Sequence, residues 1–201
     1  MTLPEWWAGI VETNVAFLGA DPVPLKFRTG ELSQIPQAKL RELVRNYGRD
    51  FFELAPKGIA PLLLGPMAAY KSFSAALLAR QIRERALVRV DWVDCPVLLN
   101  AFERRRFDVE TSERIEQIKN TGWLVMDDFA FVRLGTWQSD LMAEIACHRF
   151  DNAMPICWTG NVHMDVDEKA PLAILSEVVG GQLARRILEA SQGYRLLVSH
   201  P

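Results

Sequence analysis

The chain has 201 residues, of which 49% are hydrophobic and 24% charged, and its formal net charge is −2 at pH 7. This composition is that of an ordinary globular protein, and it excludes collagen-like, disordered and strongly basic chains. A nucleic-acid partner would therefore need a local basic patch. No apolar run approaches the roughly 18 residues of a membrane span, and the N-terminus does not resemble a signal peptide. We expect a cytoplasmic protein with no membrane contact.

Three cysteines, Cys95, Cys147 and Cys157, stand in apolar surroundings. Their odd number and the lack of a CxxC pair argue against a disulfide framework or a cysteine metal site. We expect them to be reduced core residues.

Residues 1–22 are predicted to form a short N-terminal helical extension. Apolar side chains between residues 3 and 19 follow helical spacing, and glycine and proline residues then end the pattern. Trp6 and Trp7 lie in this segment. They could pack back on the domain, or they could form an exposed hook that docks in a groove of a partner protein. Because a compact α/β core does not need this segment, both interpretations stay open.

From residue 23 to residue 201, apolar strands alternate with amphipathic helices. Helices are expected over residues 37–54, 72–85, 96–106, 109–120, 136–150 and 182–190, with a short one beginning at 171–175. Strands are expected over residues 59–64, 86–93, 123–126, 155–159 and 194–198. Strands separated by helices indicate a parallel sheet covered on both faces, so the sequence predicts a single α/β domain.

A phosphate-binding loop is predicted between the first strand and the helix that follows it. The segment Gly65–Ser72 matches the P-loop pattern at its first Gly, its Lys and its Ser. Such a loop turns backbone N–H groups toward an anion at a helix N-terminus. The residues expected to contact the phosphates of ATP are Gly65, Pro66, Ala68, Ala69, Tyr70, Lys71 and Ser72. Lys71 would reach the β- and γ-phosphates, and the Ser72 hydroxyl would bind Mg²⁺.

Tyr70 stands where the P-loop pattern has its second Gly. That Gly allows close backbone approach and a positive φ, and tyrosine has neither the small size nor the easy positive φ. Either the loop takes a different path, or phosphate binding is weakened or lost. A plain strand–turn–helix, with Lys71 merely in the first helical turn, would give the same octapeptide.

The third apolar strand, from Trp123 to Met126, is followed by the paired carboxylates Asp127 and Asp128. Carboxylates at the end of a neighbouring parallel strand face the same crevice as the loop. Asp127 is predicted to hold Mg²⁺, and Asp128 to orient or deprotonate the attacking water. The alternative is a strand that simply ends in an Asp-rich turn.

Two arginine groups are further candidates. Arg185 and Arg186 lie in the helix after Gly180-Gly181, and an arginine that reaches the γ-phosphate of a neighbouring subunit would make hydrolysis depend on assembly. The run Arg104-Arg105-Arg106 follows another helix and could neutralise the backbone phosphates of DNA. For both groups the alternative is a solvated surface.

Taken in order, these segments resemble the DnaC/IstB-type helicase-loader branch of the AAA+ ATPases. The segments that carry the resemblance are Pro61–Ser72, Leu98–Phe102, Trp123–Asp128, Ile145–Phe150, Pro155–Asn161 and Gly181–Leu188. The resemblance covers about residues 25–201. It implies a P-loop NTPase fold of the ASCE type, a three-layer sandwich around a central parallel sheet, with ATP and Mg²⁺. It also implies a homo-oligomer formed through the ATP site, with single-stranded DNA and a replicative helicase as partners.

The resemblance also assigns two further roles. In AAA+ ATPases the strand after the acidic pair ends in a sensor that contacts the γ-phosphate or the water, and Asn161 matches it by order and residue type. Arg186 matches the arginine finger best, because it precedes the apolar pair Ile187-Leu188, and Arg185 is the second choice.

The sequence departs from this family in three ways. Tyr70 replaces the loop glycine, and the N-terminal helicase-binding domain is missing or reduced to about residues 1–22. No separate lid domain is expected before Pro201, a feature that the loaders share. We expect a compact, phage-type or mobile-element helicase loader with slow ATP hydrolysis, that is, a weak ATPase. One alternative is a non-hydrolysing AAA+-like adaptor. The other is an IstB-like transposition ATPase that acts on target DNA.

Overall fold

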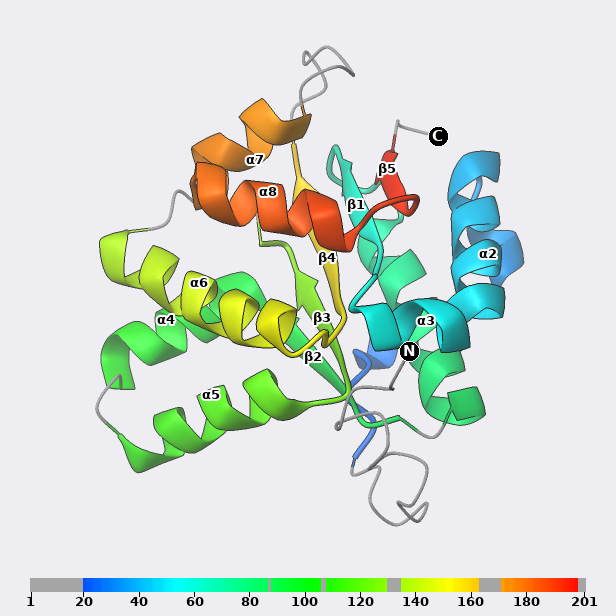
Figure 1. Ribbon diagram of the computed structural model, residues 1–201. Coiled ribbons are helices and arrows are strands. Elements are labelled where there is room, and N and C mark those ends of the chain that lie inside the picture. The colour runs from blue at the N-terminus through cyan, green and yellow to red at the C-terminus, as the bar shows by residue number, and fades with distance from the viewer. Residues whose placement is uncertain (1–19, 87, 106–107, 130–134, 163–170, 199–201) are drawn as a thin grey trace.

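The computed structural model describes residues 20–86, 88–105, 108–129, 135–162 and 171–198 (Figure 1). Trp6 and Trp7, and with them the predicted N-terminal helix, lie outside these residues. The division into residues 1–22 and 23–201 therefore stays a prediction.

A five-stranded sheet with the order β2-β3-β4-β1-β5 forms the centre of the protein. Its strands are β1 (Leu62–Gly65), β2 (Val90–Asp94), β3 (Trp123–Asp127), β4 (Ile156–Asn161) and β5 (Arg195–Leu197). Every pairing is parallel. All strand carboxyl ends therefore lie at one edge of the sheet, where β4 stands between β1 and β3.

Helices cover both faces of the sheet (Figure 1). The helices are α2 (Ala38–Leu54), α3 (Lys71–Ala86), α4 (Cys95–Arg105), α5 (Val109–Asn120), α6 (Thr136–Asp151), α7 (Pro171–Val179) and α8 (Gly181–Ala190). Buried apolar side chains form two clusters, one on each face of the sheet, because successive side chains of a strand point to opposite faces. In β1, Leu63 packs with α2 and α3, whereas Leu62 and Leu64 pack with the helices of the other face. The predicted three-layer α/β sandwich is confirmed.

The predicted elements are found with shifted ends. The largest difference is in the second strand, which was expected from residue 86 and begins at Val90, because its pairing with β3 starts with Val90 opposite Trp123. Val88 is buried although it lies outside the strand. Burial therefore accounts for the apolar residue at position 88.

Arg149 ties together the amino end of the sheet. Its side chain is 0% exposed. Nη1 donates to the carbonyl oxygens of Ile118, Lys119 and Thr121 at 3.0, 3.1 and 2.7 Å, and Nη2 donates to that of Pro155 at 2.8 Å. One guanidinium thus joins the end of α5 to the segments that enter β3 and β4. Burial lowers the pKa of Arg149 to about 9.

The expectation that the cysteines are core residues holds for two of the three. Cys95 and Cys157 are buried, Cys147 is half-buried, and all three are free thiols. No helix in the described part of the chain is long and apolar enough to cross a membrane.

Candidate functional site

The predicted phosphate loop joins the carboxyl end of β1 to the N-terminus of α3. Gly65 closes the strand beside the segment that follows β5, and a Cβ added to Gly65 would lie 2.3 Å from the carbonyl oxygen of Val198. A side chain at position 65 would therefore push these segments apart. The first Gly of the motif is explained by this close approach.

Two loop residues other than glycine adopt the left-handed backbone conformation, Ala68 with a φ of 61° and Tyr70 with a φ of 60°. This conformation costs about 1–2 kcal/mol for a residue with a Cβ. The Tyr70 carbonyl accepts hydrogen bonds from the backbone N–H and the hydroxyl of Ser74, at 2.9 and 2.8 Å, which fix the start of α3. A tyrosine thus makes the turn for which a glycine was expected.

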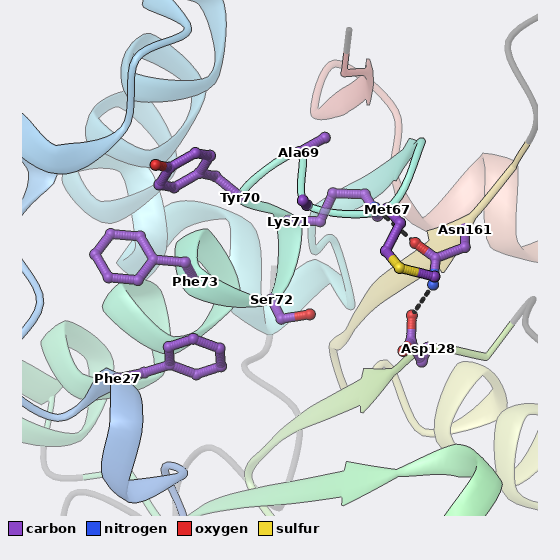
Figure 2. Close-up of a pocket in the computed structure, with 10 residues that line it drawn as sticks. Phe27, Met67, Ala69, Tyr70, Lys71, Ser72, Phe73, Asp128 and Asn161 are labelled. Atoms are coloured by element: carbon purple, nitrogen blue, oxygen red, sulfur yellow. Dashed lines mark hydrogen bonds between the residues drawn. The ribbon is translucent and has the colours of Figure 1, made fainter. Parts of the chain in front are cut away.

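Lys71 is almost completely buried at the start of α3, with 4% of its surface exposed. Its ammonium group donates to the carbonyl oxygen of Pro66 at 2.5 Å and to Oδ1 of Asn161 at 2.9 Å. Asn161 in turn donates from Nδ2 to Oδ1 of Asp128 at 2.6 Å (Figure 2). Burial lowers the pKa of Lys71, and the charges of Asp128 and Asp127 oppose this effect. The structure therefore joins three residues that the sequence analysis assigned separately.

The acidic pair is held by Thr159 of β4. The Thr159 hydroxyl donates to Oδ1 of Asp127 at 2.5 Å and accepts the backbone N–H of Asp128 at 3.1 Å. The Ser72 hydroxyl also lies close to the Asp127 carboxyl, where it opposes the rise in pKa that burial causes. Burial raises the pKa of both carboxyl groups, and the neighbouring charge of Asp127 further raises that of Asp128. A cation at this place would relieve the electrostatic penalty of two desolvated carboxylates.

A cavity of about 380 Å³ opens beside the loop. It is lined by Phe27, Met67, Ala68, Ala69, Tyr70, Lys71, Ser72, Phe73, Asp128 and Asn161. Figure 2 shows the rings of Phe27, Tyr70 and Phe73 at one side, with Asp128 and Asn161 at the other. The size is within the usual range for small-molecule sites. Five of the predicted phosphate contacts line the cavity; Pro66 instead gives its carbonyl to Lys71, and Gly65 lies behind the loop.

The residues also fit a magnesium ion. The Ser72 hydroxyl and the Asp127 carboxylate are adjacent oxygen donors, which Mg²⁺ prefers. Within the described ranges, no group of three or more His, Cys, Asp or Glu side chains could hold a metal on its own. This is the arrangement expected where one or two protein oxygens and the phosphates of a nucleotide share the ion.

The other candidate residues lie elsewhere. Arg186 is on α8 and pairs with Asp151 at 3.0 Å beside a second cavity near the amino end of β1, so it does not reach the cavity of its own chain. Its role toward a neighbouring molecule stays a prediction. Arg104 is exposed on α4, which ends at Arg105, and Arg106 lies outside the described residues.

Sequence reasoning gave no role to Thr159, Phe27 or Phe73. A threonine inside an otherwise apolar buried strand is a signal that could have identified Thr159. No local signal marks Phe27, which lies in a short 3-10 turn far upstream of the loop. Tertiary packing of its ring on Phe73, with centroids 5.9 Å apart, and on Trp92 brings it to the cavity.

At the level of sequence, no protein-family model matches this chain, and no curated protein matches it. Solved structures do match it. The DnaC helicase loader superposes with a TM-score of 0.76 at 18% identity, over 89% of this chain and 100% of that one. DnaI superposes with a TM-score of 0.65 at 19% identity, over 89% and 92%. The replication initiator DnaA bound to AMPPCP and single-stranded DNA gives 0.65 at 15% identity, over 88% and 50%.

At these identities the likeness is one of fold. The chain has the parallel α/β fold seen in DnaC, DnaI and DnaA. The resemblance to DnaC-type proteins predicted from the motifs is confirmed at this level.

Proposed function

We propose that this protein is an ATP-binding helicase loader of DNA replication that oligomerises on ATP, engages a replicative helicase and single-stranded DNA, and hydrolyses ATP slowly. The observation that carries the proposal is the hydrogen-bonded network of Lys71, Asn161 and Asp128 around a cavity at the N-terminus of α3. The fold shared with the DnaC helicase loader supports the loading role. The fold shared with DnaA, which was solved with AMPPCP and single-stranded DNA, supports nucleotide and DNA as ligands.

The roles of the residues follow from their chemistry. The N-terminus of α3 and the loop N–H groups would bind the phosphates. Lys71 would exchange its bonds to Pro66 and Asn161 for phosphate oxygens. Mg²⁺, held by Ser72 and Asp127, would neutralise charge on the triphosphate.

Asp128 is the proposed general base. A desolvated carboxylate with a raised pKa suits proton transfer from water. Its Oδ1 already accepts a hydrogen bond from Asn161, which we propose orients the carboxylate and senses the γ-phosphate. Hydrolysis is expected to be slow, because this pair must rearrange when the phosphate arrives.

The partner contacts belong to the same proposal. Arg186 would reach the ATP of a neighbouring subunit after leaving Asp151. The run from Arg104 to Arg106 would contact single-stranded DNA, and Trp6 and Trp7 would dock on the helicase.

A titration with MgATP tests the nucleotide site. We expect micromolar binding by the wild type, a loss of about 100-fold or more in Lys71→Ala, and dependence on Mg²⁺. Lys39→Ala is the matched control, because Lys39 is exposed on α2 and its replacement is expected to leave binding unchanged. Wild-type protein that does not bind MgATP at millimolar concentration would overturn the proposal.

An ATP-dependent pull-down of the helicase then separates a loader from a transposition ATPase, which would bind target duplex DNA instead.

A non-hydrolysing adaptor is the second candidate, and Tyr70 favours it. The positive φ of Tyr70 departs from the usual P-loop glycine, and the Lys71 ammonium group donates to the carbonyl oxygen of Pro66 within the loop. MgATP binding without any phosphate release, with and without single-stranded DNA, would identify an adaptor.

A further inference from the structure

Three aromatic side chains, Phe27, Tyr70 and Phe73, line one side of the cavity, and we call them the aromatic recess. The rings of Tyr70 and Phe27 both stand edge-on to Phe73, at centroid distances of 6.0 and 5.9 Å and interplanar angles of 88° and 84°. Figure 2 shows Tyr70 and Phe27 on either side of Phe73. The Phe27 ring also contacts Trp92 of β2 at 6.4 Å, which anchors the recess to the sheet.

The recess lies where a nucleobase would be. The charged and amide side chains that line the cavity are Lys71, Asp128 and Asn161, and with Ser72 they define the phosphate end. A nucleotide with its phosphates at the start of α3 extends its base away from this end. The base would then meet the rings, and flat rings stack on any nucleobase, since every base has a π-face.

Distinguishing one base from another takes polar groups aimed at the base edge. In the segment that carries Phe27, five of the carbonyl oxygens between residues 24 and 30 already have donors. Those of residues 24, 25 and 27 accept backbone N–H groups, and those of Arg28 and Gly30 accept the Arg80 guanidinium at 2.5 and 2.7 Å. The Tyr70 carbonyl is taken by Ser74. The Tyr70 hydroxyl points away from Ser72 in Figure 2.

We infer that the aromatic recess stacks the nucleobase without reading its edge, so that the site accepts ATP and GTP with similar affinity. Tyr70, which replaces the loop glycine, is then the residue that supplies base affinity. This inference rests on the proposed function, namely that the cavity binds a nucleoside triphosphate.

The experiment compares MgATP, MgGTP and magnesium triphosphate, which has no base, by calorimetric titration of the full chain. For the wild type we expect the dissociation constants of MgATP and MgGTP to agree within about fivefold. Tyr70→Asn removes the ring while keeping a residue that tolerates a positive φ. It is expected to weaken both nucleotides by about tenfold, as for loss of one stacking contact, and to change triphosphate affinity less than twofold.

Two matched variants sharpen the result. Tyr70→Phe keeps the ring and is expected to bind both nucleotides within twofold of the wild type. Phe52→Asn removes an aromatic ring on α2 that is 58% exposed and is expected to leave all three affinities unchanged. Thermal unfolding of each variant shows whether it is folded.

The outcomes separate the inference from the proposed function. MgATP binding with MgGTP more than about 20-fold weaker would overturn the inference and leave the nucleotide site intact. Unchanged nucleotide affinity in Tyr70→Asn would also overturn it. If the wild type binds none of the ligands, the proposed function itself is wrong.

Discussion

Two buried cations lie at opposite ends of the same sheet, and their partners differ. Arg149, at the amino end, is 0% exposed and donates to four backbone carbonyls. Lys71, at the carboxyl end, is 4% exposed and donates to one carbonyl and one side-chain amide, beside a cavity and two carboxylates. Both have a pKa lowered by burial. Burial alone therefore does not distinguish them.

The kind of hydrogen-bond partner distinguishes the two cations. Backbone carbonyls at helix and strand ends cannot find another donor in the interior, so removing Arg149 leaves them unsatisfied. The side-chain partner of Lys71, Asn161, lines the cavity and can turn toward water or a ligand. The amino end is thus built for stability and the carboxyl end for exchange. Four substitutions test this contrast.

Arg149→Met is expected to have the largest effect, a loss of about 3–5 kcal/mol in the free energy of unfolding, because four carbonyls lose their donor together. Urea unfolding measures it. Arg45→Met is the control, since Arg45 is exposed on α2 and its replacement should change stability by about 0.5 kcal/mol at most. A loss below about 1 kcal/mol in Arg149→Met would mean that other donors replace the guanidinium.

Lys71→Met is expected to change the free energy of unfolding by about 1 kcal/mol at most, since it also removes a desolvated charge. Its dissociation constant for MgATP should rise about 100-fold or more, which corresponds to about 2.7 kcal/mol. Urea unfolding and calorimetric titration give the two values. If this variant were as unstable as Arg149→Met, Lys71 would be a structural residue and the contrast would fail.

Asp127→Asn is expected to stabilise the protein by about 1 kcal/mol at pH 7 while weakening MgATP binding. Burial raises the pKa of the Asp127 carboxyl above its usual 3.8, so the folded state binds this proton more tightly than the unfolded state. The wild type therefore loses stability as the pH rises from 3.8 through the folded pKa, and the full penalty remains above it. Thermal unfolding of both proteins between pH 8 and pH 4 should show their difference shrinking toward the acid end. A less stable Asp127→Asn at pH 7 would contradict this.

Ala68→Gly should have the smallest effect, a gain of about 0.5–1 kcal/mol, because glycine relieves the left-handed conformation but raises the entropy of the unfolded chain. Ala153→Gly, at a φ of 52° near the amino end, is the matched variant and should gain a similar amount. Only Ala68 lines the cavity, so only Ala68→Gly should alter MgATP affinity. If both variants changed the affinity for MgATP equally, nucleotide binding would not distinguish the carboxyl end of the sheet from its amino end.

The sequence by itself determined the order of the strands and helices along the chain and the residues at the strand ends. Apolar periodicity is local, so runs such as Trp123–Met126 predict a buried strand without knowledge of its neighbours. The same local patterns singled out Lys71 and Ser72 as candidates at the start of a helix, and Asp127 and Asp128 at the end of a strand.

The tertiary structure decided which strands, and therefore which of these residues, lie side by side. Asn161 bonds Lys71 across 90 positions of sequence, and it can do so because β4 stands between β1 and β3. The pairing of β4 with β3 also brings Thr159 to the acidic pair. Packing on Phe73 and Trp92 brings Phe27 to the loop, and Arg149 reaches three carbonyls that lie 28 to 31 positions away in sequence. Strand order is set by how all layers pack together, and no local pattern contains it.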